Sequence, residues 1–197
     1  MLEAQGLTVF RAERLVFRDV GFSVGPGGAL VLSGPNGSGK SSLLRLLAGL
    51  LPPAAGRVLW EGADAFTDAG AHARRLAYVG HQDAVKPGLT ATQNLRFAAR
   101  ATGGSVAAAL EAMRLGPLAD LPVRLLSAGQ RRRLALARLA FSAAPLWLLD
   151  EPTIGLDASS VEAFGALLSA QRARGGVVVA ATHLGLPLPD AAVLQLG

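Results

Sequence analysis

The sequence predicts an α/β domain whose central sheet is interrupted by an inserted group of helices. Short apolar runs of strand length alternate with stretches of helical spacing towards both ends of the chain. Between residues 83 and 143, in contrast, Ala-rich helical stretches follow one another without a strand between them. The chain has 197 residues, slightly more than the usual size of one domain. We therefore expect one domain over residues 1–197, with a helical lobe at about 83–143.

The single elements are predicted from apolar runs and from the residues that end them. A turn at Pro26, Gly27 and Gly28 separates two strands, and Gly49 ends the helix that starts near Gly39. Strands are expected at residues 7–10, 15–24, 29–33, 57–60, 76–80, 146–149, 176–181 and 190–196. Helices are expected at residues 39–48, 90–101, 105–115, 127–142 and 158–174.

The composition argues against several classes of protein. The chain has no cysteine, which excludes disulfides and thiolate metal sites. Its N-terminus lacks the basic head and apolar run of a secretory signal. The most apolar of its long stretches, residues 134–149, is interrupted by Arg138 and is shorter than the roughly 20 residues that a membrane-spanning helix needs. We expect a chain that is soluble alone or held at a membrane only through a partner.

The net charge of +5 raises the question of a nucleic-acid partner. The positive residues are spread along the chain, and only residues 131–133 form a tight cluster of three arginines. We expect this cluster to be a solvated helix face whose side-chain stems pack on their neighbours. The charge therefore does not predict binding to nucleic acid.

A glycine-rich segment lies between an expected strand and an expected helix. It matches the pattern G-x-x-x-x-G-K-[ST] and comprises Gly34, Pro35, Asn36, Gly37, Ser38, Gly39, Lys40 and Ser41, followed by Ser42. Glycines let successive backbone N–H groups point inward at phosphate oxygens, and the helix that follows adds positive partial charge. Lys40 is expected to reach the β- and γ-phosphates, and the Ser41 hydroxyl to bind Mg²⁺. This motif predicts a site for a nucleoside triphosphate.

Two carboxylates follow the apolar strand at residues 146–149. Ligands bind at strand ends in open α/β sheets. We expect Asp150 to hold Mg²⁺, directly or through water, and Glu151 to polarise the attacking water as general base. A solvated acidic turn is the alternative, and the phosphate-binding loop in the same chain favours the catalytic interpretation.

Five residues at the start of an expected helix point to a family. Leu126, Ser127, Ala128, Gly129 and Gln130 resemble the LSGGQ signature of ABC transporter ATPases. The resemblance covers essentially the whole chain, with the family's motifs in the family's order. It implies a P-loop NTPase core with a mostly parallel central sheet, an antiparallel N-terminal β-subdomain and an inserted α-helical lobe. It also implies ATP and Mg²⁺ as ligands.

The resemblance assigns three further residues. Gln82 resembles the Q-loop glutamine, which implies contact with Mg²⁺ and a coupling role for its loop. Asp157 lies in a segment that resembles the D-loop. His183 resembles the switch histidine, which implies contact with the γ-phosphate and positioning of water near Glu151.

The same resemblance implies a head-to-tail dimer. Each ATP is expected between Lys40 of one subunit and the segment Ser127, Ala128 and Gly129 of the other. A helix that starts at Ser127 offers a second anion site of the same kind as the phosphate-binding loop. Two distant anion sites in one chain make sense if each grips the opposite side of one nucleotide. Binding of ATP then closes the dimer and hydrolysis releases it.

The chain departs from the family pattern at two places. Ala128 stands where most members have glycine, and its Cβ is tolerable if the residue is helical. Most members also stack an aromatic residue on adenine, and the corresponding position here is Arg11, next to Phe10. Either Arg11, through its guanidinium plane, or Phe10 is expected to contact the base.

Two segments, residues 80–97 and 126–139, resemble the ATP-binding subunits of cytochrome c maturation (Ccm) haem exporters. This implies that separate integral membrane permease subunits are the partners, and that this chain lies peripherally on the cytoplasmic side of the cell membrane. Energy is expected to pass to them through the Gln82 loop and the helical lobe. The alternatives are the ATPase of another small exporter, for drugs or polysaccharide, a soluble ABC protein acting on DNA or ribosomes, and a P-loop kinase. The last two lack support, because the chain has neither paired domains nor a long coiled-coil insertion, and a kinase needs a lid in place of a signature loop.

Overall fold

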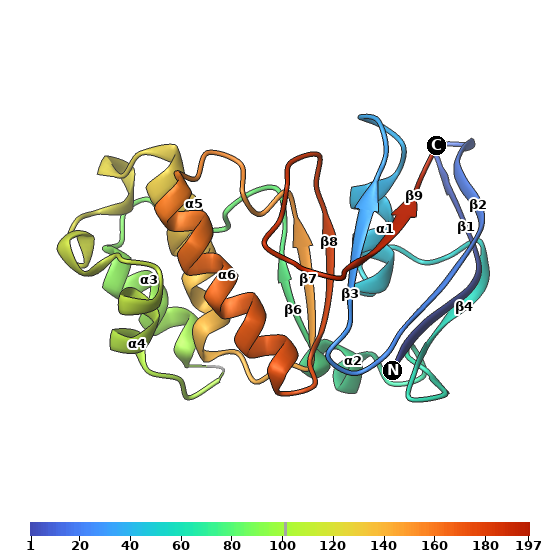
Figure 1. Ribbon diagram of the computed structural model, residues 1–197, viewed down its shortest axis with the longest axis horizontal. Coiled ribbons are helices and arrows are strands. Elements are labelled where there is room, and N and C mark those ends of the chain that lie inside the picture. The colour runs from blue at the N-terminus through green and yellow to red at the C-terminus, as the bar shows by residue number, and fades with distance from the viewer. Residues whose placement is uncertain (101) are drawn as a thin grey trace.

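Two β-sheets form the framework of the fold (Figure 1). The computed structural model describes residues 1–100 and 102–197. An antiparallel sheet has the strand order β2-β1-β4-β5, with β1 Leu2–Arg11, β2 Arg14–Val24, β4 Ala55–Trp60 and β5 Ala63–Asp64. A parallel sheet has the order β6-β7-β8-β3-β9, with β6 Leu76–Val79, β7 Leu146–Asp150, β8 Val177–Ala181, β3 Ala29–Ser33 and β9 Ala192–Gln195.

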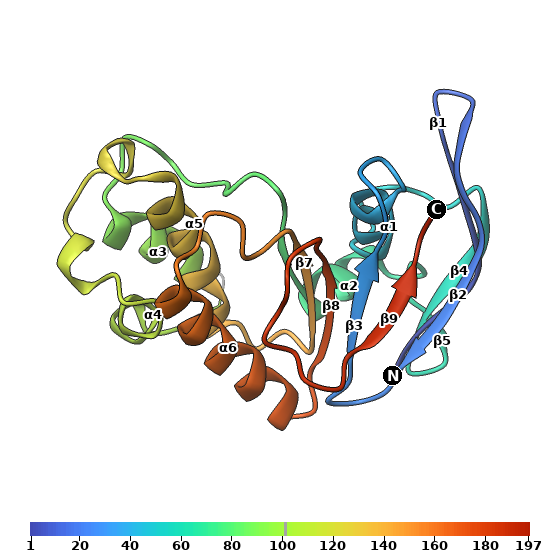
Figure 2. The same cartoon turned by 45° about the horizontal axis from the view of Figure 1, so that its top comes forward.

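The helices lie on both faces of the parallel sheet. Helix α1 (Lys40–Leu47) lies between the two sheets, as Figures 1 and 2 both show. The remaining α-helices are α2 Ala69–Arg75, α3 Ala91–Ala99, α4 Val106–Ala112, α5 Ala128–Ala137 and α6 Ala158–Ala173. Three short 3-10 turns are η1 Gly116–Leu118, η2 Val123–Leu125 and η3 Arg138–Phe141.

Strand β7 shows why the sheet is covered on both sides. Its side chains alternate between two apolar clusters, because successive residues of a strand point to opposite faces. Leu146 and Leu148 pack in the cluster that contains α1 and the antiparallel sheet. Trp147 and Leu149 pack in the cluster that contains α5 and α6. A strand with both faces buried reads as a continuous apolar run, which is the pattern the sequence has here.

Three of the parallel strands end at the same edge of the sheet. Asp150 at the end of β7 pairs with Ala181 at the end of β8, and Leu32 of β3 also pairs with Ala181. The loops that follow these strands therefore start side by side. This edge carries the phosphate-binding loop and both predicted carboxylates.

The structure agrees with most of the expected elements and differs at a few. Helix α2 and strand β5 were not predicted, since α2 has no long apolar face and β5 has only two residues. The helix expected at residues 127–142 ends as an α-helix at Ala137 and continues as the 3-10 turn η3. Strand β1 begins at Leu2, because Leu2 pairs with both Val24 and Trp60. Ala101, the expected end of the helix from residue 90, lies outside the described residues.

Candidate nucleotide-binding site

The loop between β3 and α1 has a backbone that requires glycine. Gly34, Gly37 and Gly39 have φ values of +141°, +86° and +100°, which side chains other than glycine rarely adopt. Packing adds a second requirement at two of these positions. A Cβ at Gly34 would lie 2.1 Å from the carbonyl oxygen of Leu196, and one at Gly39 would lie 2.7 Å from a methyl group of Val16.

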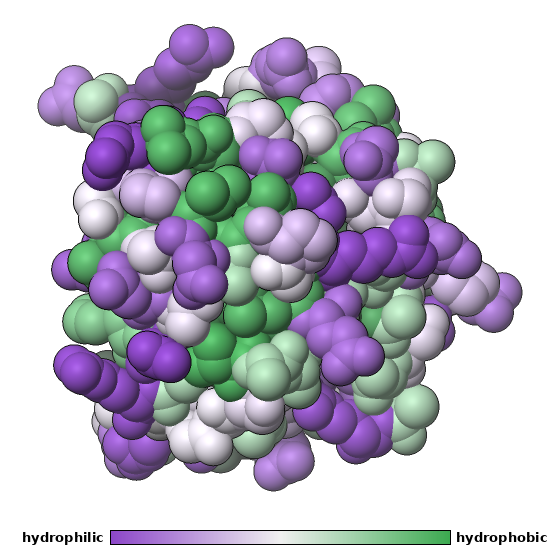
Figure 3. All heavy atoms as spheres, turned by 90° about the vertical axis from the view of Figure 1, so that its left-hand side faces the viewer, coloured by the Kyte–Doolittle hydropathy of each residue, from purple (hydrophilic) through white to green (hydrophobic). Residues whose placement is uncertain are grey.

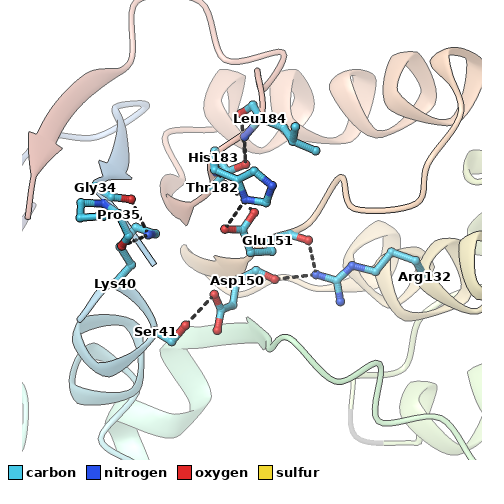
Figure 4. Close-up of polar contacts among 10 residues, drawn as sticks. All are labelled: Gly34, Pro35, Lys40, Ser41, Arg132, Asp150, Glu151, Thr182, His183 and Leu184. Carbon is cyan, nitrogen blue, oxygen red and sulfur yellow. Dashed lines mark hydrogen bonds and ion pairs between the residues drawn. The ribbon is translucent and has the colours of Figure 1, made fainter. Parts of the chain in front are cut away.

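The ammonium group of Lys40 lies over this loop. Its Nζ donates to the carbonyl oxygens of Gly34, at 2.7 Å, and Pro35, at 3.0 Å (Figure 4). The preceding residue, Gly39, is the N-cap of α1 and offers no side chain to the first N–H groups of the helix. The buried hydroxyl of Ser38 also has no hydrogen-bond partner among the described residues. The loop thus combines a cation, free N–H groups and a hydroxyl, which are the groups that bind phosphate.

Ser41 and Asp150 meet beside the loop. The Ser41 hydroxyl donates to Oδ1 of Asp150 at 3.0 Å, and Asp150 is 2% exposed (Figure 4). A hydroxyl and a carboxylate oxygen are suitable ligands for Mg²⁺, which keeps several waters and binds substrate phosphates. The described residues contain no cluster of three or more acidic, His or Cys side chains that could hold a metal alone. The pair therefore fits a metal that takes its other ligands from phosphate and water.

Glu151 and His183 are brought together by the neighbouring strands β7 and β8. The ring Nδ1 of His183 lies 3.0 Å from Oε1 of Glu151, and the main-chain N–H of His183 donates to Oε2 at 3.4 Å. Glu151 has a φ of +48° and donates its own N–H to the carbonyl oxygen of Ala181 at 2.8 Å. The carboxylate is 13% exposed and the imidazole 52% exposed, so the pair lies at the surface of the site with the acid inside.

Lys40, Ser41, Glu151 and His183 share one cavity of about 930 Å³, and Asp150 adjoins it through its bond with Ser41. Such a volume lies at the upper end of the range for small-molecule sites. The lining residues are Arg11, Arg14, Leu15, Val16, Asn36, Gly37, Gly39, Lys40, Ser41, Ser42, His81, Glu151, Ile154 and His183. The cavity therefore joins the phosphate-binding loop to the Glu151–His183 pair and to basic side chains from β1 and β2.

The segment at residues 127–130 lies in a different cavity, of about 190 Å³, which shares none of its described lining residues with the first. Ser127 is the N-cap of α5, and its hydroxyl accepts from the N–H of Gln130 at 3.2 Å. The Gln130 side chain accepts from the N–H of Ser127 at 2.8 Å, which completes a capping box. The lining residues are Ser127, Gly129, Gln130, Arg133, Gly155, Leu156, Asp157 and Ser160.

Asp157 links this second cavity to α6, because it is the N-cap of that helix. Its carboxylate accepts from the N–H of Ser160 at 2.8 Å and from the hydroxyl of Ser159 at 3.1 Å. Hydrogen bonds from Ser160, and then from Ser159, lower the pKa of Asp157 below its usual value of 3.8. The carboxylate thus stays charged at the edge of the second cavity.

Comparison with known proteins identifies the family. The model of the ABC transporter family matches residues 17–154, which is more than half of the chain. The chain belongs to the ABC transporter family. It is 52% identical over 195 residues to the cytochrome c biogenesis ATP-binding export protein CcmA of Rhodospirillum rubrum, covering 98% of this chain and 84% of the relative. It is 50% identical to the protein of the same description from Paramagnetospirillum magneticum, covering 98% and 92%.

Solved structures of ABC transporter proteins have the same fold. An ATP-binding subunit of an ABC transporter superposes with a TM-score of 0.81 and 27% identity, over 93% of this chain and 80% of that one. A dimeric ATP-binding cassette in a post-hydrolysis state, bound to ADP and Pi, superposes with a TM-score of 0.83 and 25% identity, over 100% and 94%. The predicted fold class, with its parallel core sheet, antiparallel sheet and helices, is confirmed.

Gln82, the residue that resembles the Q-loop glutamine, also lies away from the first cavity. Gln82 is exposed and outside the cavity lining, whereas its neighbour His81 lines the cavity. Contact of Gln82 with a metal at Ser41 and Asp150 would require its loop to move inward. His81 was missed because the sequence signal, a polar residue shortly after strand β6, applies equally to both residues.

The cavity wall that β1 and β2 contribute is basic and apolar. Arg11 lines it and Phe10 does not, so of the two candidates only Arg11 is placed to contact a base. Arg14, Leu15 and Val16 line the same cavity and were not predicted as site residues. They follow Arg11 across the β1–β2 hairpin, a proximity that the sequence alone does not reveal.

The burial of Arg132 shows that the expectation of a fully solvated arginine cluster was wrong. The cluster was expected to be a solvated helix face, but Arg132 is only 5% exposed. Its guanidinium donates to the carbonyl oxygens of Asp150, at 2.6 Å, and Glu151, at 2.9 Å. The prediction failed because a run of like charges shows no periodicity from which burial of one member can be deduced.

Proposed function

We propose that this chain is the ATP-hydrolysing subunit of an ABC transporter that exports haem for cytochrome c biogenesis. The observation that carries the proposal is that two sets of motif residues line two separate cavities on one protomer. Lys40 and Glu151 line the large cavity, while Ser127 and Gly129 line the small one. The relation to the CcmA proteins, at about half identical residues, supports the export role.

In this proposal the large cavity holds the triphosphate. Lys40 exchanges its bonds to the loop carbonyls for bonds to the β- and γ-phosphates, and the loop N–H groups bind the remaining oxygens. Ser41 and Asp150 hold Mg²⁺, which neutralises charge on the phosphates. Asn36 and Ser42 complete the lining of the phosphate end, and Gln82 would join the metal's ligands if its loop moved inward.

Glu151 acts as the general base on water. A carboxylate that accepts hydrogen bonds from both the ring and the main chain of His183 has one defined orientation, which general-base catalysis needs. His183, being half exposed, is free to contact the γ-phosphate from the same side. Glu151 thus takes the proton, and His183 orients the water.

The small cavity serves the partner's nucleotide. Ser127, Ala128 and Gly129, with Gln130 and Asp157 beside them, cover the ATP that the other subunit holds. A head-to-tail dimer then completes two equivalent sites, and ATP forms part of the interface. The dimeric arrangement of a structurally similar ATP-binding cassette supports this.

A separate membrane permease is the proposed partner for transport. Among the described residues, no helix has the length and apolarity to cross a bilayer. A groove of about 300 Å³ lies between residues 83–87 and 123–131. Leu121 and Leu125, in or next to the second of these segments in the sequence, are exposed. Figure 3 shows the helical side of the molecule, where apolar surface is interrupted by polar side chains. We assign this side, on the cytoplasmic face of the membrane, to contact with the permease.

Co-purification tests the function most directly. The chain is expressed with a tag in its native host, solubilised in mild detergent and isolated with its bound subunits. We expect integral membrane proteins of the cytochrome c maturation system and an ATPase activity that needs Mg²⁺. Isolation with a permease of a drug or polysaccharide exporter would overturn the haem assignment and leave the ATPase assignment intact.

A further inference from the structure

Every N–H donor of the buried Arg132 guanidinium is hydrogen-bonded to an oxygen in the active-site region. Arginine has five such donors in a planar fork. Nη2 donates to the carbonyl oxygens of Asp150 and Glu151, and Nε donates to that of Pro152 at 3.2 Å. Nη1 donates to the carbonyl oxygen of Gly80, at 2.9 Å, and to Oδ1 of Asp83, at 3.1 Å. A cation with all its donors paired in one place holds its acceptors in a fixed geometry.

Three of these acceptors are consecutive carbonyls of the turn that carries the proposed base. Figure 4 shows the guanidinium reaching the carbonyl oxygens of Asp150 and Glu151. Glu151 is in the left-handed region, with a φ of +48°, which costs free energy in a residue other than glycine. Carbonyl oxygens that converge on one point repel each other unless a cation lies between them. Arg132 therefore compensates both the strain of the turn and the convergence of its oxygens.

The other two acceptors belong to the start of the loop that joins the sheet to the helices. Gly80 follows β6, and Asp83 lies three residues further along that loop. Asp83 is held from a second side, since Nη2 of Arg138 donates to its carbonyl oxygen at 3.2 Å. Arg132 itself lies in α5, the helix that begins after Ser127. One side chain thus ties α5 to the turn at Glu151 and to the loop at Gly80.

We propose that Arg132 is a positioning residue that fixes the main-chain conformation of Glu151 and couples that conformation to the position of α5. This rests on the proposed function. In the head-to-tail dimer, α5 presents Ser127 to the partner's nucleotide, while its Arg132 holds the base for the protomer's own nucleotide. Arg132 then connects the two ATP sites of the dimer.

The experiment compares Arg132→Lys with a matched control. Lysine keeps the charge but cannot form the fork. The control is Arg172→Lys, because Arg172 also donates to two main-chain carbonyls, of Gly27 at 2.8 Å and Pro189 at 2.7 Å, outside both cavities. We expect Arg132→Lys to lower kcat by at least tenfold, with the Kd for MgATP within threefold of the unmodified protein. We expect Arg172→Lys to keep kcat within twofold, although both variants lower Tm.

Amide hydrogen exchange of residues 150–154 gives a readout that needs no activity. Arg132→Lys and the neutral variant Arg132→Gln are each expected to speed exchange in this segment by at least tenfold, with no change in residues 34–42. If kcat stays within twofold in Arg132→Lys, or if kcat and ATP affinity fall in parallel, the proposal is wrong. Unchanged exchange at residues 150–154 would overturn it as well. Absence of ATP hydrolysis in the unmodified protein would instead overturn the proposed function.

Discussion

The backbone of Gly129 packs directly against the backbone of Gly155. A Cβ atom at Gly129 would lie 2.3 Å from the carbonyl oxygen of Gly155, closer than the two atoms can approach. Ala128, one residue earlier, is exposed at the first position of α5. A side chain would therefore clash at Gly129, whereas the Cβ of Ala128 is exposed on the protomer.

This contact predicts that two small substitutions at neighbouring positions differ in their effect on dimer formation. Gly129→Ala is expected to push the start of α5 away from Gly155 and to weaken ATP-dependent dimer formation at least tenfold, with ATP affinity unchanged. Ala128→Gly is the control, and it costs at most about 1 kcal/mol of helix stability. Light scattering after gel filtration with MgATP measures the dimer in a Glu151→Gln background. Equal dimer formation by the two variants would contradict the assignment of this segment to the interface.

Glu151→Gln is expected to abolish turnover and accumulate the ATP-bound dimer. The amide keeps the shape of the side chain but cannot take a proton, so kcat is expected to fall by about 10²- to 10⁴-fold. The control is Glu162→Gln, an exposed acid on α6 that contacts Arg114 at the surface. Steady-state phosphate release and gel filtration with ATP measure the two effects. Normal hydrolysis by Glu151→Gln would remove Glu151 from the role of base.

Lys40→Ala is expected to weaken binding of MgATP about 10- to 100-fold, because a charge-assisted contact to phosphate contributes roughly 1.5–3 kcal/mol. The chain offers a matched control, since its only other lysine is Lys86. Lys86 lies 4.6 Å from the ring centre of Phe97, on the loop beside α3. Titration with a fluorescent ATP analogue measures both variants. Equal affinity in Lys40→Ala and Lys86→Ala would refute the phosphate-binding role of Lys40.

Asp157→Asn is expected to lower Tm at pH 7 by an amount that disappears in acid. Because hydrogen bonds from Ser160 and Ser159 lower the pKa of Asp157, its carboxylate stabilises the folded state above the unfolded value of 3.8. That stabilisation is lost as the pH falls through the lowered pKa of the folded state. Asp157→Ala also removes the cap and is expected to stay less stable at every pH. Thermal unfolding from pH 7 to pH 3 checks this, and a Tm difference for Asp157→Asn that does not narrow would contradict it.

The elements with strong local signals were predictable from the sequence. The loop at residues 34–41 needs positive φ values, which only glycine adopts readily, so its spacing is visible in the residues themselves. The apolar runs of β3, β7 and β8 are equally local. In contrast, α2 was missed because it is held by contacts with other elements, such as the bond from buried His72 to the carbonyl oxygen of Leu47 at 2.8 Å.

The site residues differ in the same way: those with a local sequence signal were predicted, and those placed by distant contacts were not. Lys40, Ser41, Asp150 and Glu151 were predicted by motif and by their place at strand ends, and the structure brings them together. Three things were not predictable: the burial of Arg132, the choice of His81 over Gln82 as a cavity residue, and the cavity wall at residues 14–16.

The sequence by itself determined most of the strands, the phosphate-binding loop and the order of the functional residues. Each of these depends on the conformational preference of a few neighbouring residues, which the local pattern records. Only the tertiary structure decided that Arg132 of α5 is paired with the carbonyls beside Glu151, and that His81, in place of Gln82, lines the cavity. Such relations depend on which distant segments exclude water from each other, and burial of a charge is favourable only once all its partners are in place.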